Sequence, residues 1–256
     1  MPIHSSTAEP ALSIVIATFN ARRTIERCLA SVVAQSSRAW ELIVIDGASR
    51  DTTMDVVDRF SDHITHVVSE PDTGIYDAWN KALLRARGRY VCFLGADDAF
   101  AEEHAVASIL EAIGGQSYDL VSSRCRWVDA SGKRLGEGGG GWDFARIGPK
   151  MPLCHPGLWH ARALFDRHGA FDTSYRITGD LDFLLRLPAS TRALHVDRIT
   201  VDVETGGISR AQTLMRLREQ RRALSTCPRF GSIRAWMTWA NKMWRYPIAR
   251  ALKLPF

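Results

Sequence analysis

Four short apolar runs in the first hundred residues constrain the fold more than any other feature of this chain. They are rich in β-branched residues and recur every 22 to 30 residues or so, at residues 12–17, 41–45, 64–68 and 90–94. Runs of this kind are typical of strands buried on both faces of a parallel sheet. The segments 21–35 and 74–86 between them place apolar residues on one helical face. This alternation predicts an α/β fold with a doubly wound open sheet.

The second half of the chain is less regular. Its pattern predicts strands at 119–128 and 134–135, a glycine-rich loop at 136–141, helices at 161–168 and 180–187, and one or two strands at 192–203. Two further helices are expected at about 211–224 and 233–244, with Pro247 interrupting the second. A length of 256 residues suits one large α/β domain with an appendage.

Polar side chains follow each of the four predicted strands. In open α/β sheets, ligands bind beyond the carboxyl ends of the strands. Helix capping or turn formation also accounts for several of these acids, and that alternative stays open for Asp46, Asp72, Asp77 and Asp98. No Walker A or GxGxxG glycine loop is present, so an acidic crevice needs Mg²⁺ or Mn²⁺ to hold a diphosphate. The candidates are Thr18, Asn20, Asp46, Glu70, Asp72, Asp77, Asp97 and Asp98.

The same segments carry a resemblance to a known family. SIVIATFN (13–20), ELIVIDGASRD (41–51), SEPDTGIYDAWNKA (69–82) and FLGADD (93–98) resemble, in order and spacing, the family 2 glycosyltransferases of the GT-A fold. The resemblance covers about residues 12–203. It implies a Rossmann-like, open, mostly parallel sheet flanked by helices, and a nucleotide-diphosphate-sugar donor, whether UDP-, GDP- or dTDP-linked.

The resemblance also implies roles for individual residues. Thr18, Asn20 and Asp46 would contact the base and ribose, and Glu70 and Asp77 the donor side of the pocket. Asp97 and Asp98 would stand for the family's DxD motif, with Asp98 nearer the metal, although the strict D-x-D spacing is absent.

The likeness continues into the second half. CHPGLW (154–159) resembles the family's "HQ" segment, and GDLDFLLRL (179–187) the segment that carries the catalytic base. Asp180 keeps the base position, while Gly179 replaces the usual acidic neighbour. Asp182 is the alternative base, or else an acid paired with arginine. His155 is expected either near the acceptor or phosphates, or as a structural histidine.

The implied reaction is transfer of a sugar by a metal-dependent inverting glycosyltransferase. Displacement of a nucleoside diphosphate by a hydroxyl needs a base at that hydroxyl and positive charge at the leaving phosphate. The loop from Gly206 to Arg210 lies where members of the family have a mobile loop that closes over the donor diphosphate, and Ser209 or Arg210 would reach phosphate there. For this segment the alternative is a plain loop before a helix. The alternative is a non-catalytic member of the fold that binds a nucleotide sugar without turnover.

Charge separates the C-terminal end from the rest of the chain. From Arg210 onward there are eleven Lys and Arg residues and one acid, Glu219, a net charge of +10, whereas the preceding 209 residues carry 22 basic and 27 acidic groups, a net −5. We therefore divide the chain into a catalytic domain, 1–209, with a donor half (about 12–100) and an acceptor and base half (about 101–209), and a basic helical tail, 210–256. On a helix, the tail places its apolar residues on one face: Ile233, Trp236, Met237, Ala240 and Trp244.

A basic amphipathic helix with tryptophans is typical of segments that lie on anionic membranes, and the alternative is packing on the protein's own core. Nucleic acid is not expected as a partner, because the body is acidic and carries no reader motif. The nearest likeness, to colanic-acid-type and phenolic-glycolipid-type transferases, implies a lipid-linked or glycan acceptor. Five scattered cysteines and the lack of an apolar leader or spanning segment predict a cytoplasmic protein, peripheral at the inner face of the cell membrane.

Overall fold

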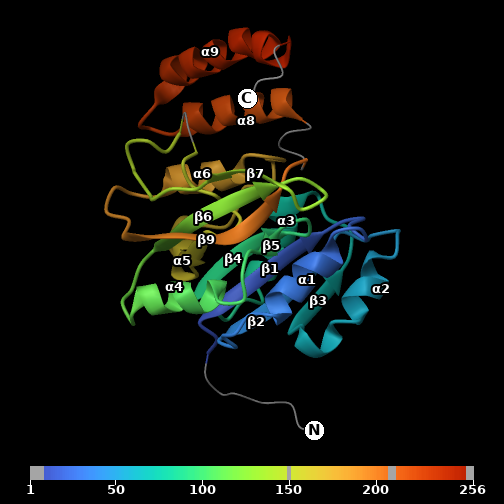
Figure 1. Cartoon of the computed structure of the whole chain (residues 1–256). Coiled ribbons are helices and arrows are strands. Elements are labelled where there is room, and N and C mark those ends of the chain that lie inside the picture. The colour runs from blue at the N-terminus through green and yellow to red at the C-terminus, as the bar shows by residue number, and fades with distance from the viewer. Residues whose placement is uncertain (1–8, 149–150, 207–211, 252–256) are drawn as a thin grey trace.

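The computed structural model describes residues 9–148, 151–206 and 212–251. Within these residues one nine-stranded sheet runs through the protein, with helices on both faces (Figure 1). The strand order is β3-β2-β1-β4-β8-β6-β9-β5, and β7 pairs with β6 outside this path. The α/β class predicted from the alternating runs is confirmed.

The first half of the sheet is parallel, as predicted. Its four strands are β1 (Leu12–Thr18), β2 (Trp40–Asp46), β3 (His66–Ser69) and β4 (Tyr90–Gly95). The helices between them are α1 (Ile25–Val33), α2 (Thr53–Asp58) and α3 (Ile75–Leu83), with a 3-10 turn at Ser61–His63. In the register, Thr18 lies beside Asp46, Asp46 beside Ser69, and Ala17 beside Gly95. All four polar strand ends therefore meet at one edge of the sheet.

The second half mixes strand directions. It comprises β5 (Ala99–Phe100), α4 (Ala105–Ile113), β6 (Leu120–Val128), β7 (Arg134–Gly138), β8 (Trp159–Ala161), α5 (Ala163–His168), α6 (Gly179–Arg186) and β9 (Ala193–Glu204). Strand β8 runs antiparallel to both β4 and β6, while β6 and β9 are parallel. Thus β8 joins the two halves into one sheet.

The structure differs from the sequence prediction in β8, where no strand was expected, and in three further details. Strand β7 extends through Gly138 into the predicted glycine loop, because Trp127 covers these glycines and a Cβ at Gly138 would lie 2.6 Å from its ring. Asp98 does not cap a helix near residue 101, because β5 follows it to pair with β9, and α4 begins only at Ala105. Helix α9 continues past Pro247, since a proline removes only one backbone donor.

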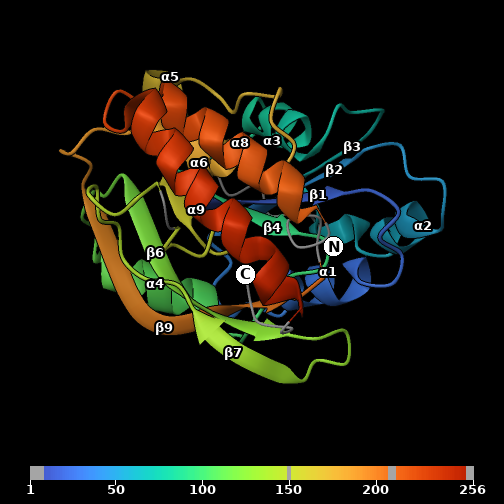
Figure 2. The same ribbon diagram turned by 90° about the horizontal axis from the view of Figure 1, so that it is seen from above.

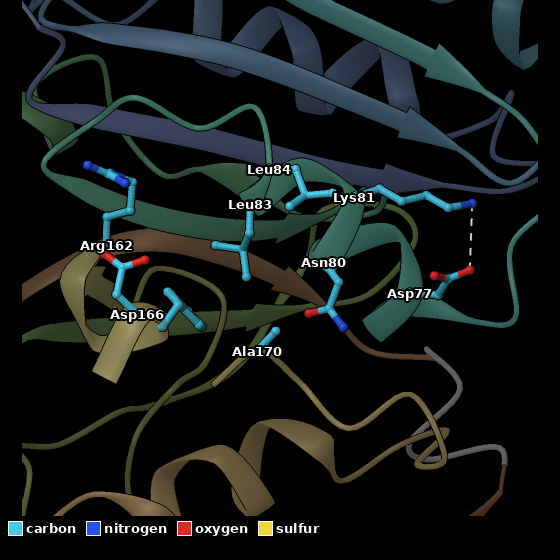
Figure 3. A pocket seen from close by; sticks show the side chains of 9 residues that line it. Asp77, Asn80, Lys81, Leu83, Leu84, Arg162, Asp166 and Ala170 are labelled. Atoms are coloured by element: carbon cyan, nitrogen blue, oxygen red, sulfur yellow. Dashed lines mark ion pairs between the residues drawn. The ribbon is translucent and has the colours of Figure 1, made fainter. Parts of the chain in front are cut away.

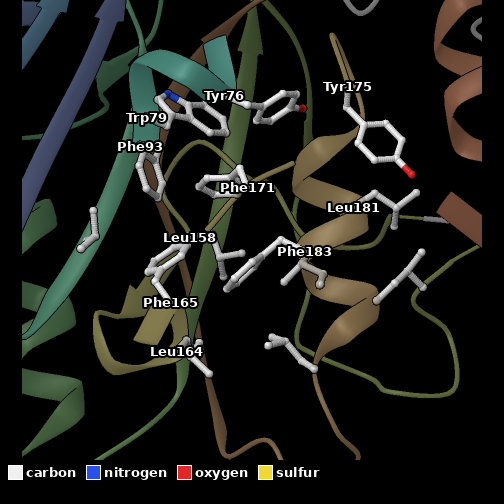
Figure 4. Packing of buried hydrophobic residues seen from close by; sticks show 14 of the residues in the cluster. Tyr76, Trp79, Phe93, Leu158, Leu164, Phe165, Phe171, Tyr175, Leu181 and Phe183 are labelled. Atoms are coloured by element: carbon white, nitrogen blue, oxygen red, sulfur yellow. The ribbon is translucent and has the colours of Figure 1, made fainter. Parts of the chain in front are cut away.

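Aromatic side chains fill the core on one face of the sheet, between α3, β4 and α6 (Figure 4). Trp79 packs 4.7 Å from Phe93, and Phe165 packs 4.6 Å from Phe183, measured between ring centroids. Aromatic contacts of this kind stabilise beyond the area they bury. The cluster therefore holds α3 and α6 rigidly against the strand that ends in the acidic pair.

The basic tail forms two helices, α8 (Thr213–Thr226) and α9 (Gly231–Ala251), which lie next to each other over the body (Figures 1 and 2). Leu217 and Leu224 of α8 are buried, and Leu224 belongs to the same core cluster as α6. Helix α9 is the outer layer and buries Ala235. Its large apolar side chains Ile233, Trp236, Met237 and Trp244 are exposed.

Candidate active site

A pocket of about 890 Å³ opens at the edge of the sheet where the parallel strands end. Of the strand-end candidates named from sequence, Thr18, Asn20, Asp72 and Asp97 line it. The other lining residues that bear on the chemistry are Phe19, Arg23, Arg27, Gly47, Gly74, Ile75, Arg176, Glu204 and Gly206. The pocket therefore lies beyond the carboxyl ends of the parallel strands, where the sequence pattern predicted a ligand site.

The loop after β1 forms one wall of the pocket. Thr18 is 5% exposed, and its Oγ1 has no hydrogen-bond partner among the described residues. A buried hydroxyl without a partner costs free energy, so a ligand that bonds to it gains affinity. The side-chain oxygen of Asn20 instead accepts the Arg50 N–H at 2.9 Å, and the backbone N–H of Asn20 donates to the Ser49 hydroxyl at 2.8 Å. Asn20 thus ties this wall to the loop after β2.

Asp46 lies below the pocket and anchors the loop after β2. It is fully buried, and its Oδ2 accepts the Ser49 N–H at 2.9 Å and the Ser69 hydroxyl at 2.7 Å. Its neighbour Gly47 lines the pocket, where a Cβ would lie 2.6 Å from Oδ2 of Asp72. The glycine therefore lets the Asp72 carboxylate close over the loop.

Asp72 lines the pocket, one of the two alternatives that the sequence left open for it. Its Oδ1 accepts the N–H of Gly74, the N-cap residue of α3, at 2.9 Å. Burial raises the pKa of its carboxyl above the ordinary value. Asp72 therefore orders the turn before α3 and also faces the pocket.

The acidic pair after β4 is the most strongly perturbed feature of the site. Asp98 is 4% exposed, and its Oδ2 accepts the Gly95 N–H at 2.9 Å. Burial, and then the adjacent charge of Asp97, raises the pKa of Asp98 well above its usual range. Arg27 opposes this effect, with its guanidinium bonded to the Asp97 carbonyl and, at 2.9 Å, to Glu204.

The pair has the chemistry of a divalent-cation site. A Cβ at Gly95 would lie 2.6 Å from Oδ1 of Asp97 and 3.0 Å from Oδ2 of Asp98, so oxygens of both carboxylates lie close together beside this glycine. Hard cations such as Mg²⁺ bind one or two carboxylates and take phosphate oxygens and water as their other ligands. Among the described residues, no three His, Cys, Asp or Glu side chains gather as a metal site.

Asp180 lies in the first turn of α6 and is not among the residues that line the pocket. Its Oδ1 accepts the Leu181 N–H at 2.8 Å and the Tyr76 hydroxyl at 3.3 Å. Tyr76 follows Ile75, which lines the pocket. Burial raises the pKa of Asp180 to about 6, so this carboxylate takes up and releases protons near neutral pH.

The runner-up acid, Asp182, has different partners. It pairs with Arg186 at 3.5 Å and bonds to Tyr175, as the arginine-paired alternative predicted. Gly179 also has a physical reason: a Cβ there would lie 2.8 Å from the Tyr76 ring. Tyr76 thus occupies the space of any side chain at position 179, and its hydroxyl contacts Asp180.

Two predicted donor residues lie away from the large pocket. Glu70 pairs with Lys81 at 3.0 Å, and Asp77 accepts the Thr73 N–H at 3.0 Å and lies 3.6 Å from Lys81. Asp77 lines a separate pocket of about 340 Å³, together with Asn80 and Arg162 (Figure 3). Their contacts are those of helix capping and ion pairing.

His155 is a core histidine in this structure. Its ring stacks on Trp79 with centroids 5.0 Å apart, and it is not among the residues that line the large pocket. Burial lowers its pKa to about 3, so the ring is neutral at physiological pH. It supplies no positive charge toward a phosphate.

Sequence reasoning missed the cations of the pocket. Arg23, Arg27 and Arg176 all line it. No motif marks them, although Arg176 stands four residues before Asp180 in the segment that suggested the base. Ser209 and Arg210, which we expected near phosphate, lie outside the described residues.

The fold is that of the GT-A glycosyltransferases. A mannosyltransferase from Pyrobaculum calidifontis, PcManGT, in complex with GDP-Man and Mn²⁺, superposes with a TM-score of 0.68, at 19% identity, over 96% of this chain and 76% of that one. Staphylococcus aureus TarS in complex with UDP-GlcNAc superposes with a TM-score of 0.66, at 16% identity, over 90% of this chain and 70% of that one.

Sequence comparison identifies the family. Residues 13–158 match the profile of glycosyl transferase family 2. A PGL/p-HBAD biosynthesis glycosyltransferase of Mycobacterium bovis is 33% identical over 217 residues, which are 79% of this chain and 80% of the relative. A putative teichuronic acid biosynthesis glycosyltransferase of Bacillus subtilis, TuaG, is 41% identical over 98 residues, 37% of this chain and 39% of the relative. The chain belongs to glycosyl transferase family 2 and is a glycosyltransferase, which confirms the resemblance read from its motifs.

Proposed function

We propose that this protein transfers a sugar, with inversion, from a nucleotide-diphosphate sugar to a hydroxyl group of a lipid-linked or glycan acceptor. One observation carries the proposal: Asp97 of the acidic pair and Ile75 of α3 line a single pocket, and Tyr76, the residue after Ile75, bonds to Asp180 at 3.3 Å. Donor phosphates and an acceptor base need this juxtaposition. The donor complexes of the two structural neighbours, with GDP-Man and UDP-GlcNAc, support the donor class.

The pocket offers groups that suit both the nucleoside and the charged diphosphate of such a donor. Thr18 offers an unpaired hydroxyl to the nucleoside, and exposed Phe19 beside it offers an apolar surface. Asp97 and Asp98 would hold Mg²⁺ or Mn²⁺, and this cation supplies positive charge for the departing diphosphate. Arg23 and Arg176 add positive charge at the pocket wall.

Asp180 acts as the general base in this proposal. With a pKa raised to about 6, its carboxylate is deprotonated at pH 7 and accepts the proton of the acceptor hydroxyl. The acceptor oxygen forms its bond to the anomeric carbon while the bond from that carbon to the diphosphate breaks. A single displacement of this kind inverts the anomeric centre.

A member that binds nucleotide sugars without turnover is the competing function. Its support in the sequence was the missing acid at Gly179 and the altered DxD motif. Tyr76 now accounts for the glycine, because its ring fills the space at position 179 and its hydroxyl bonds to the remaining acid. The geometry therefore favours the enzyme.

The experiment is a panel of UDP-, GDP- and dTDP-sugars with Mn²⁺ or Mg²⁺, in which nucleoside diphosphate release and donor binding are measured separately. We expect Asp180→Asn to bind donor and to lose turnover by about 10²- to 10⁴-fold, the usual contribution of a positioned base. Asp182→Asn is the matched control. Donor binding without release by the unmodified protein, with every acceptor tried, would favour the non-catalytic alternative.

We propose a lipid-linked acceptor because of the outer helix. The exposed fractions of Ile233, Trp236, Met237 and Trp244 on α9 lie between 56% and 77%. They belong to a segment with a net charge of +10, whereas the body is acidic. Tryptophans and cations on one helix suit the headgroup layer of an anionic membrane. Among the described residues no helix has the length and apolarity to cross a bilayer.

The relatives support the same acceptor class. Their names place them in PGL/p-HBAD and teichuronic acid biosynthesis. For this chain we propose a role in surface glycan or glycolipid synthesis, as a cytoplasmic protein that binds peripherally at the inner face of the cell membrane. In that arrangement α9 would keep the enzyme on the surface that carries its acceptor.

Vesicle binding tests the membrane surface. The double variant Trp236→Gln, Met237→Gln should lose cosedimentation with vesicles that contain anionic lipid, whereas Leu84→Gln, which removes an 85% exposed leucine elsewhere, should not. Binding of the unmodified protein should weaken with salt, because charge attraction is screened over roughly 8 to 10 Å at physiological ionic strength. Equal binding by both variants would refute the assignment of this face.

A further inference from the structure

The only acid of the basic tail, Glu219, makes contacts that its position in the sequence does not suggest. Its Oε1 accepts the Arg176 N–H at 2.8 Å, and its Oε2 accepts the Ile177 and Thr178 N–H groups at 2.9 and 3.0 Å. The carboxylate from α8 thus holds three consecutive backbone donors of another segment.

These donors lead directly into α6. The first N–H groups of a helix lack partners within it. Thr178, at the N-cap of α6, makes no capping bond with its own side chain. Glu219, from a helix about forty residues away in sequence, accepts the N–H of this N-cap residue and of the two residues before it. A charged acceptor on backbone N–H groups makes short, strong hydrogen bonds.

A second side chain of α8 holds the same loop from its other end. Arg222, one turn after Glu219, donates to the Ser174 hydroxyl at 2.6 Å and to Asp172 at 3.1 Å. Its guanidinium also lies 4.2 Å from the centroid of the Tyr175 ring. Helix α8 itself is fixed in the core by Leu217 and Leu224. Side chains of α8 therefore hold the loop before α6 in place.

The loop before α6 connects to two residues of the candidate active site. The side chain of Arg176 lines the pocket, and Asp180 follows Thr178 by two residues. We propose that Glu219 is a positioning residue for the transfer reaction: by holding the N–H groups of residues 176–178, it sets Arg176 at the pocket and Asp180 at the acceptor. This inference rests on the proposed function, since it takes Asp180 as the base.

The electrostatics give the proposal a distinctive readout. The charged and titratable groups that act on Asp180 are Tyr76, from α3, and Glu219, from α8. The hydroxyl of Tyr76 lowers the pKa of Asp180, and the negative charge of Glu219 raises it. Neutralising Glu219 should therefore lower the pH at which kcat declines on the acidic side of its pH profile, the acid limb. Loss of a residue that only stabilised the fold would not shift this limb.

The test compares Glu219→Gln with Glu111→Gln, a matched change of an exposed acid on α4. For Glu219→Gln we expect kcat to fall on the order of 10- to 100-fold, as for a base displaced by a fraction of an ångström to about 1 Å. The KM for donor should change little, and the acid limb should shift downward. Glu111→Gln should match the unmodified enzyme in kcat, in KM for donor and in the position of the acid limb.

A lower melting temperature with kcat and the acid limb unchanged would overturn the proposal. If Glu219→Gln does not fold, Glu219→Asp keeps the charge but shortens the side chain, and we expect a loss of kcat without a shift of the acid limb. Asp180→Asn is measured beside it. Unchanged turnover in Asp180→Asn overturns both the assignment of Asp180 as the base and the positioning role of Glu219. Loss of turnover in Asp180→Asn but not in the Glu219 variants overturns only the positioning role.

Discussion

Removal of one hydroxyl group, in Tyr76→Phe, tests how the structure sets the pKa of the base. Tyr76 is buried at 3% exposure, and its hydroxyl donates to Oδ1 of Asp180 over 3.3 Å. A donor stabilises the charged form of a carboxylate and so lowers its pKa. The substitution leaves the ring over Gly179 and removes only this donor. We therefore expect the pKa of Asp180 to rise.

The magnitude follows from the length of the bond. Hydroxyl donors usually lie about 2.7 to 2.8 Å from their acceptors, and bonds to charged groups stabilise by about 1.5 to 3 kcal/mol at such geometry. At 3.3 Å we assign about 1 kcal/mol, which corresponds to ~0.7 of a pKa unit. Starting from a pKa of about 6, the deprotonated fraction at pH 6 then falls about threefold, and at pH 8 it hardly changes.

The assay is kcat against pH at saturating donor and acceptor. Tyr175→Phe is the matched control, because it removes a second buried tyrosine hydroxyl, one that bonds to Asp182 and not to Asp180. An acid limb that stays in place or moves downward in Tyr76→Phe would refute the reasoning. A shift in Tyr175→Phe alone would make Asp182 the base.

The remaining predictions concern the donor side and the core. Asp98→Asn, which keeps the shape of the side chain, should abolish the chelator-sensitive part of donor binding in calorimetry, since the cation loses a carboxylate. Thr18→Val should weaken donor binding about tenfold without lowering the melting temperature, because the hydroxyl it removes has no hydrogen-bond partner in the part of the chain that the structure describes. Gly47→Ala should weaken donor binding in the same assay, as its Cβ would lie 2.6 Å from the Asp72 carboxylate. His155→Phe should leave the rate profile between pH 5 and 8 unshifted, because a histidine whose pKa is lowered to about 3 does not titrate there; a displaced limb would contradict its placement in the core.

The strand and helix pattern of the first hundred residues was readable from sequence, because a buried parallel strand must be apolar along its whole length. The polar residues directly after such strands could then be placed at one edge, since parallel strands share their carboxyl ends. The sequence therefore determined the architecture of the donor half, the place of the pocket, and Thr18 and Asp97 on its wall. Motif resemblance added the family and singled out Asp180.

Tertiary packing alone decided the partners of those residues. Spacing along the chain did not show that the Asp46 carboxylate would accept hydrogen bonds from the hydroxyls of Ser49 and Ser69 and from a backbone N–H, or that His155 would stack on Trp79. Hydrogen bonds and desolvation depend on which groups approach within about 3 Å, and residues distant in sequence supply them.

The same physical reason explains the tail. Composition marked the segment from Arg210 as a separate basic appendage, but composition averages over residues. The one exception to its charge, Glu219, holds the backbone before α6, and Leu224 extends the core beneath it. Whether an acid faces solvent or binds three backbone N–H groups is decided by the fold that brings α8 to that loop.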